Sequence, residues 1–400
     1  MTNIYAALEI GTTRTVLAVG EAETGGRLKV TCHAEIPSSG VKKSQILNIG
    51  DVTQSIRSVI YQIEEKQKKQ GASLSLGNAV LVVTGQHVKA DVFTGTVQVD
   101  GATVSAADVA AVEEKARSLV LPRDRELLAV IDKDYELDEL VGVAEPLGMS
   151  GRVLSLNTLQ VHAEHNRIED ARKAASNLHL EIRDAVYAVT CAADAVLEER
   201  DRRGGVLVLD FGGGSTGYAV YLDGYLAATG VVGVGGDHIT NDIASAFQTT
   251  QAQAEDLKIQ EASAMLSASD EVASRVKLPG ESPIMESRTI SRRALNTVVN
   301  ARMHELIDII REQLEAQGLI SRLHAGVVMT GGGAALKDLD ALIQRELGAN
   351  VRVGRPIHVD GLDEEAHPEA FATIAGALLY AHQNYEEKSL LGSLFGGLFK

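Results

Sequence analysis

The chain has little of what marks a disulfide-rich or nucleic-acid-binding protein. Its 400 residues include two cysteines and seven prolines, and 38 Lys and Arg stand against 54 Asp and Glu, a net charge of −16. Cys32 and Cys191 are isolated in apolar stretches, so we expect reduced core thiols without disulfide or metal spacing. With no long basic run, nucleic-acid binding is not expected, and charge alone attracts the chain only weakly to anionic lipid.

Other common signatures are missing as well. No apolar run approaches the length of a membrane span, and neither a G-x-G-x-x-G nor a Walker A loop occurs. The first residues pass directly into an apolar strand, so we expect no cleaved leader. What the chain has instead is a set of short glycine-rich turns.

One strand–turn–strand pattern occurs twice. Residues 7–20 read ALEIGTTRTVLAVG, and residues 207–222 read LVLDFGGGSTGYAVYL. In each copy an apolar strand ends in an acid, Glu9 or Asp210, and glycine and small hydroxylated residues lead into a second strand. Two such units predict a duplicated domain with a cleft between the copies.

These turns suit phosphate, because glycine lets backbone N–H groups approach phosphate oxygens and the hydroxyls add donors. Glu9 and Asp210 offer the oxygen ligands that a hydrated Mg²⁺ prefers. A plain glycine hairpin is the alternative for a single G-G-G, but the paired copies favour phosphate. The predicted phosphate contacts are Gly11, Thr12, Thr13, Gly212, Gly213, Gly214 and Ser215.

A third glycine cluster extends this prediction. Residues 326–333 read GVVMTGGG, a buried strand that enters a turn and then a helix, which is a common nucleotide contact. Glu255 and Lys258 lie three apart on one predicted helix face, so the acid could accept from ribose hydroxyls while the Lys stem covers a base. An exposed ion pair is the alternative. The remaining predicted nucleotide contacts are Gly235, Gly236, Gly331, Gly332 and Gly333.

Together these motifs resemble the actin, heat-shock chaperone and sugar kinase ATPase superfamily, and within it the FtsA family of bacterial cell division. Glu9 in L-E-I-G-T, residues 80–99 and the end of the chain choose that branch, and the resemblance covers nearly all of residues 4–400. It implies an α/β, actin-like fold of duplicated ribonuclease-H-like domains around a nucleotide cleft, with an inserted α+β subdomain in the first half. The implied ligands are ATP and Mg²⁺.

The resemblance also implies domain boundaries. The first actin-like subdomain comprises residues 1–79, 161–201 and 358–385, the inserted subdomain 80–160, the second actin-like subdomain 202–250 and 325–357, a small subdomain 251–324, and a tail 386–400. Within these we expect a helix near 105–119 capped by Ser105, a helix at 184–200, a helix pair at 289–318 and a helix at 368–385.

The tail, residues 386–400, has the pattern of an amphipathic helix. Its apolar residues fall on one helical stripe, with glycine and serine opposite and lysine at each end. Such a tail, after a flexible stretch at 385–388, is too short to span a bilayer but can lie in its interface. Docking into a groove of the protein itself or of a partner is the alternative. The predicted membrane contacts are Leu390, Leu391, Leu394, Phe395, Leu398 and Phe399.

The sequence offers few side chains that could position a water for ATP hydrolysis. Actin relatives place a Gln or Glu near the start of the helix before the second phosphate turn, whereas residues 185–190 here contain no acid or amide. Thr190 is the small polar candidate, Asp194 follows one turn later, and Gly217 stands where relatives keep an Asp. We therefore expect at most a slow ATPase in which ATP acts as a conformational ligand.

The resemblance implies a function as a membrane tether. An FtsA-like protein polymerises on the cytoplasmic face of the inner membrane at the division site, joins other division proteins, and holds the C-terminal peptide of FtsZ. Basic and amide side chains suited to that acidic peptide are Arg292, Arg293, Asn300 and Arg302. The alternatives are a PilM-like pilus-assembly protein and a small-molecule kinase of the same superfamily.

The spacing of His162 and His165, with Glu164 between them, is compatible with a metal pair. Strand alternation followed by a helix start explains this spacing better, so we expect no metal there.

Overall fold

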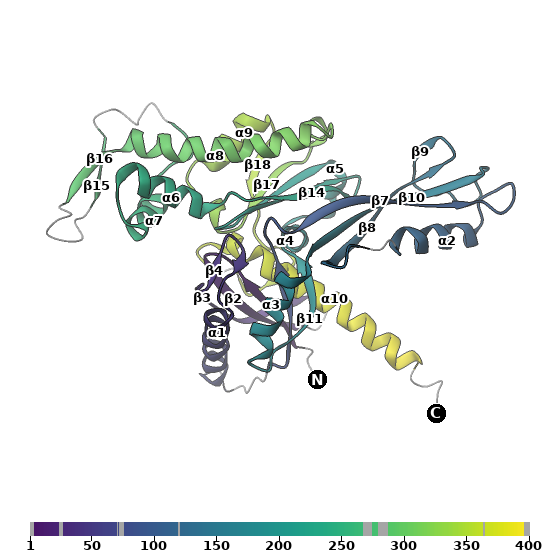
Figure 1. The fold of residues 1–400 in the computed structure, drawn as a ribbon, viewed down its shortest axis with the longest axis horizontal. Coiled ribbons are helices and arrows are strands. Elements are labelled where there is room, and N and C mark those ends of the chain that lie inside the picture. Colours follow the sequence, from purple (N-terminus) through teal and green to yellow (C-terminus); the bar gives the residue numbers. More distant parts are fainter. Residues whose placement is uncertain are drawn as a thin grey trace.

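The computed structural model describes residues 4–23, 27–69, 71, 76–118, 121–266, 274–278, 287–362 and 365–395, with side chains up to Tyr385. Two large sheets form the body of the molecule, and a third sheet projects from it (Figure 1). The small ribbon of β15 (Arg275–Leu278) and β16 (Arg288–Ser291) projects at the opposite end (Figure 1).

The first sheet has the order β11-β6-β1-β2-β3-β19. Strands β1, β2 and β3 form an antiparallel meander, while β6 and β11 follow in parallel on the β1 side and β19 lies parallel to β3. Its strands are β1 (Ile4–Ile10), β2 (Arg14–Ala22), β3 (Leu28–Pro37), β6 (Asn78–Val83), β11 (Glu181–Tyr187) and β19 (Val359–Asp360).

The second sheet, β14-β13-β12-β17-β18, repeats this plan. It has an antiparallel meander of β12, β13 and β14, with β17 and β18 parallel on the β12 side. The sequence duplication is therefore a structural duplication. The strands are β12 (Val206–Phe211), β13 (Thr216–Leu222), β14 (Tyr225–Val232), β17 (Gly326–Thr330) and β18 (Val351–Val353).

The projecting sheet is antiparallel throughout, in the order β7-β10-β8-β9. Its strands are β7 (Lys89–Gln98), β8 (Arg125–Leu137), β9 (Leu140–Val143) and β10 (Val153–Glu164). Helix α2 (Ala106–Arg117) packs on it, and Ser105 caps this helix as predicted, in a reciprocal box with Asp108. The boundary expected at residue 80 falls inside β6, which belongs to the first sheet, so the separate sheet begins with β7.

Helices surround the two large sheets. In α1 the apolar residues Val52, Ile56, Val59 and Ile63 are buried on one face, as their spacing predicts. The helices are α1 (Ile49–Lys69), α3 (His165–Ser176), α4 (Ala188–Val196), α5 (Glu199–Gly204), α6 (Gly236–Phe247), α7 (Gln251–Gln260), α8 (Arg292–Glu315), α9 (Leu339–Leu347) and α10 (Ala372–Phe395). Strands β4 (Val41–Lys42) and β5 (Gln45–Ile46) form a short hairpin with a two-residue turn. The single 3₁₀ turns are η1 (Ile320–Arg322), η2 (Gly332–Ala335) and η3 (Pro368–Phe371).

Three local predictions were wrong. The helix expected at 184–200 begins only at Ala188, because the preceding residues pair in parallel with β6 as a strand. The helix pair expected at 289–318 is strand β16 followed by the single helix α8. The flexible stretch expected at 385–388 lies within α10, whose backbone continues to Phe395.

Helices α4 and α10 cross in close contact, and α4 also packs against β12 and β13 of the second sheet. Both are rich in alanine, and an added Cβ at Gly376 of α10 would lie 1.8 Å from the carbonyl oxygen of Cys191 in α4. Both cysteines are free and buried, as expected. Among the described residues, no helix has the length and apolar character needed to cross a bilayer.

Candidate nucleotide-binding site

The two repeated turns face one cavity of about 350 Å³. They share the same backbone closure, since the N–H of Gly11 donates to the carbonyl of Arg14 at 2.9 Å and that of Gly212 donates to the carbonyl of Ser215 at 3.0 Å. All predicted nucleotide and metal residues line this cavity: Glu9, Gly11, Thr12, Thr13, Asp210, Gly212, Gly213, Gly214, Ser215, Gly235, Gly236, Glu255, Lys258, Gly331, Gly332 and Gly333.

The tips of the two turns are in contact. An added Cβ at Gly213 would lie 1.7 Å from the Thr13 hydroxyl oxygen, and one at Gly214 would lie 2.4 Å from that of Thr12. A side chain at either glycine would have to displace the threonine hydroxyl that it meets. The turns of the first and second sheets therefore meet at one cavity. This arrangement would hold a phosphate chain from both sides.

Ser44, which the sequence analysis missed, bridges the two turns. Its N–H donates to the Thr12 hydroxyl at 2.9 Å, and its own hydroxyl lies 3.4 Å from that of Ser215. Asp237, also missed, follows the Gly235–Gly236 pair at the start of α6 and accepts from the Thr13 hydroxyl at 3.4 Å. Asp237 could have been inferred from its neighbours, but nothing in the sequence around Ser44 marks it.

The acids of the two copies, Glu9 and Asp210, both line the cavity and are close enough to act on each other by charge. Burial, and next the Glu9 carboxylate, raises the pKa of Asp210 to about 7. Desolvation also raises the pKa of Glu9, although Arg14 and a hydrogen bond from Thr373 oppose the rise. Two desolvated carboxylates that disfavour each other's charge are stabilised by a shared cation, so these residues fit Mg²⁺.

Glu255 and Lys258 form a contact cluster with α6 rather than a loose surface pair. The Lys258 ammonium donates to Glu255 at 2.6 Å, to the Thr240 hydroxyl at 2.9 Å and to the Gly236 carbonyl at 3.2 Å. Glu255 also accepts from Thr240 at 2.5 Å. Both side chains line the cavity, where an acid and a Lys stem are available to a nucleoside. The cavity also has apolar walls, contributed by Ile239, Ile259, Met303, Leu306 and Leu336.

The segment expected to lack a water-orienting group, residues 185–190, approaches β13 at Gly217. An added Cβ at Gly217 would lie 3.1 Å from the Cβ of Val189, near the start of α4. The Thr190 hydroxyl donates to the carbonyl of Tyr187 at 2.8 Å, and Asp194 pairs with Arg202 at 2.7 Å beside a different cavity. The acids that line the nucleotide cavity are Glu9, Asp210, Asp237 and Glu255.

Most of the residues expected to hold a partner peptide are engaged within the protein. Arg302 pairs with Asp242 through two hydrogen bonds of 2.6 and 3.0 Å. Arg292 pairs with Glu261, and the Asn300 amide donates to the carbonyl of Ala264 at 2.7 Å. Arg293 is exposed.

Four of the six expected membrane residues lie in the part of the chain that the structure describes. Leu390, Leu391, Leu394 and Phe395 lie on the backbone of α10. Leu398 and Phe399 lie outside the described residues.

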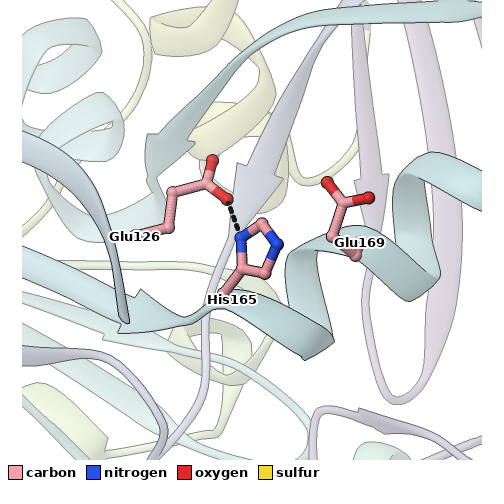
Figure 2. Close-up of side chains that lie close together, drawn as sticks. All are labelled: Glu126, His165 and Glu169. Atoms are coloured by element: carbon pink, nitrogen blue, oxygen red, sulfur yellow. Dashed lines mark hydrogen bonds and ion pairs between the residues drawn. The ribbon is translucent and has the colours of Figure 1, made fainter. Parts of the chain in front are cut away.

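His162 and His165 do not converge. The His162 imidazole contacts Asp91 and Arg125, both at 2.8 Å, on the inserted sheet. His165 instead contacts Glu126 at 2.9 Å, with Glu169 nearby on α3 (Figure 2). Arg172 donates to Glu126 at 2.6 and 2.9 Å and to Glu169 at 2.8 Å, so an arginine already compensates these carboxylates. The cluster is an ion-pair network that joins the start of β8 to α3.

Comparison with known proteins decides the family. The sequence-family model described as "Cell division protein FtsA" matches residues 207–376. The family model described as "SHS2 domain inserted in FTSA" matches residues 85–162. The cell division protein FtsA of Pseudomonas aeruginosa is 32% identical over 386 residues, which cover 96% of this chain and 90% of the relative. This chain belongs to the FtsA family. The second model coincides with the separate sheet that begins with β7.

Solved structures agree on the fold. The PilM–PilN type IV pilus biogenesis complex aligns with a TM-score of 0.63 at 17% identity, over 94% of this chain and 98% of that one. MreB5 of Spiroplasma citri bound to ADP aligns with a TM-score of 0.56 at 13% identity, over 96% and 98%. With the duplicated sheets, this likeness confirms the actin-like α/β fold expected of an FtsA-family chain with an inserted subdomain.

Proposed function

We propose that this FtsA-family chain binds ATP with Mg²⁺ in the cavity between its halves. The supporting observation is that both phosphate-type turns, the Gly331–Gly333 turn and the Glu9–Asp210 pair line one cavity. The glycine turns bind the phosphates, Glu9 and Asp210 hold the cation or its waters, and Glu255 and Lys258 face the nucleoside. Mg²⁺ supplies positive charge that neutralises the phosphate oxygens.

Equilibrium binding of a fluorescent ATP analogue tests this proposal. We expect saturable binding that ATP competes away and that weakens when EDTA removes Mg²⁺. The variant Asp210→Asn should lose the Mg²⁺-dependent part of the affinity. If the intact chain shows no saturable binding at millimolar nucleotide, the proposed site is wrong.

Nucleotide turnover is proposed to be slow, so that ATP mainly holds the halves together. The supporting observation is that none of residues 185–190 is among the described residues that line the cavity. Orienting a water for attack requires a positioned polar group, and this segment supplies none. Rapid multiple-turnover release of phosphate by the purified protein would contradict this proposal.

The assembled protein is proposed to tether a division ring to the cytoplasmic face of the inner membrane. The apolar stripe of the tail lies in the interface, and a single tail should bind weakly because ordering a glycine-containing helix is costly. Many tails on one polymer bind well through avidity. The ring component is FtsZ, with other division proteins as further partners, as the family resemblance implies.

Electron microscopy on lipid monolayers with ATP is the decisive test. The intact chain is compared with a chain that ends at Glu387. We expect membrane-bound filaments from the intact chain and none from the shortened one. If the intact chain leaves the monolayer bare, the tethering proposal loses its support, and a soluble kinase-type activity on small molecules becomes the next question.

A further inference from the structure

Helix α10 begins inside the candidate nucleotide cavity, not beside it. Ala370, just before the helix, and Thr373, in its first turn, both line the cavity. The Thr373 hydroxyl donates to the Glu9 carboxylate at 3.0 Å, and only 5% of Thr373 is exposed. A helix near the end of the chain thus touches the acid of the first turn, more than 360 positions away in sequence.

Glu9 depends on this contact for its orientation. Among the described residues, the side-chain hydrogen bond to this carboxylate comes from Thr373. Arg14 is close enough to act by charge, but its guanidinium is engaged by Glu35 and by the carbonyl of Ala370. Because Thr373 occupies one carboxylate oxygen, Oε2, the other remains available for a cation or its water.

The same turn also contacts the third glycine cluster. The carbonyl of Glu369 accepts from the N–H of Gly331 at 3.1 Å and from the Thr330 hydroxyl at 2.8 Å. Four residues later the Thr373 hydroxyl donates to Glu9. The residues that lead into α10 and its first turn therefore contact both the third glycine cluster, which would bind the nucleotide, and Glu9, which would bind its cation.

The first turns of α10 are packed tightly against α4. Gly376 lies against the backbone of Cys191, where α10 crosses α4 without room for a side chain. Packed backbone contacts of this kind transmit small displacements because interiors have little free volume. A shift of the first turn of α10 therefore moves the rest of the helix, which ends in the tail.

We propose that Thr373 is a positioning residue for the cation ligand Glu9, and that through it the first turns of α10 respond to the bound cation. This inference rests on the proposed nucleotide site. It adds the start of α10 to the segments that contribute functional side chains to the cavity. It also connects that site physically to the helix that carries the proposed membrane tail.

The test uses the full chain and the variant Thr373→Val, which keeps the shape and removes the hydroxyl. ADP affinity is measured across a Mg²⁺ titration and in EDTA. We expect the Mg²⁺-dependent gain in affinity to fall about ten-fold, as for loss of one hydrogen bond to a charged group, with the affinity in EDTA unchanged. Thr373→Ser should restore the gain, because it keeps the donor.

A second readout follows the helix itself. Hydrogen exchange of amides 372–385 should slow when Mg²⁺ is added to the ADP-bound wild type, and this slowing should be lost in Thr373→Val. The matched control is Thr158→Val, another buried threonine, whose hydroxyl faces the backbone carbonyls of Phe93 in β7 and Ala116 in α2. It should behave as wild type in both measurements.

The outcomes separate this inference from the proposed function. If the wild type binds ADP with Mg²⁺ dependence and Thr373→Val shows the same dependence, the positioning role is wrong and the nucleotide site stands. If wild-type helix exchange does not change on adding Mg²⁺, the coupling to α10 is wrong. If the wild type binds no nucleotide, the proposed function falls first.

Discussion

The carbonyl oxygen of Cys191 in α4 lies where a side chain on Gly376 of α10 would have to be. An added Cβ would approach that oxygen to 1.8 Å, and the obstacle is backbone that cannot rotate away. This crossing lies within one turn of Thr373, which lines the nucleotide cavity.

Gly376→Ala should therefore force α4 and α10 apart. We expect a loss of about 3 kcal/mol or more of unfolding free energy, because overpacking a rigid interior is strongly destabilising. Chemical denaturation monitored by circular dichroism measures it. Gly77→Ala is the control, since a Cβ there meets nothing within 4 Å. Equal stability of the two variants would show that the helices separate at little cost.

His87 should make the fold sensitive to acid. Burial, with Arg167 as the next cause, lowers the pKa of this imidazole from 6.5 to about 4. The unfolded chain takes up the proton as the pH falls through 6.5, whereas the folded protein does so only near 4. The stability contribution is therefore complete above pH 6.5 and is lost as the pH falls toward 4.

The difference in unfolding free energy between the wild type and His87→Gln, measured from pH 7.5 to pH 4.5, isolates this contribution. We expect the wild type to lose up to about 3 kcal/mol relative to the variant over this interval. Parallel pH profiles of the two proteins would show that His87 charges without penalty in the folded state.

Arg302 and Arg293, both named as peptide contacts from the sequence, should behave differently. Arg302→Ala breaks the paired hydrogen bonds to Asp242 and should cost about 1–2 kcal/mol of stability. Arg293→Ala removes an exposed side chain and should leave stability unchanged while it weakens binding of an acidic FtsZ C-terminal peptide. Fluorescence anisotropy with a labelled peptide and thermal melts of both variants decide between these roles. Wild-type peptide affinity in Arg293→Ala would remove this surface from the proposed interface.

Lys258→Ala should weaken nucleotide binding about ten-fold, because it removes a cation from the cavity wall and releases Glu255 from its pairing. Lys277→Ala, which removes an exposed lysine of β15, should bind nucleotide as the wild type does. Titration with a fluorescent ATP analogue compares the two. A loss of the same size in both variants would point to net charge rather than to the site.

Much of the site could be predicted because its chemistry is local in sequence. Each phosphate turn is a continuous stretch in which an acid, glycines and hydroxyls follow one another, so the pattern carries its own function. Ser44 and Thr373 could not be predicted in this way. They reach the turns from the β4–β5 hairpin and from α10, and a single hydroxyl among ordinary neighbours gives no signal.

The amino-acid sequence by itself determined the duplicated turns, the family resemblance and the acids and glycines of the turns that line the cavity, because these rest on local spacing and residue type. Only the tertiary structure decided that Glu181–Tyr187 is a strand, since its pairing partner β6 is distant in sequence. The tertiary structure also decided that Arg292 and Arg302 serve internal ion pairs, and that Gly376 is a helix crossing. Pairing, ion contacts and close packing join residues far apart in the chain, so the folded arrangement alone specifies them.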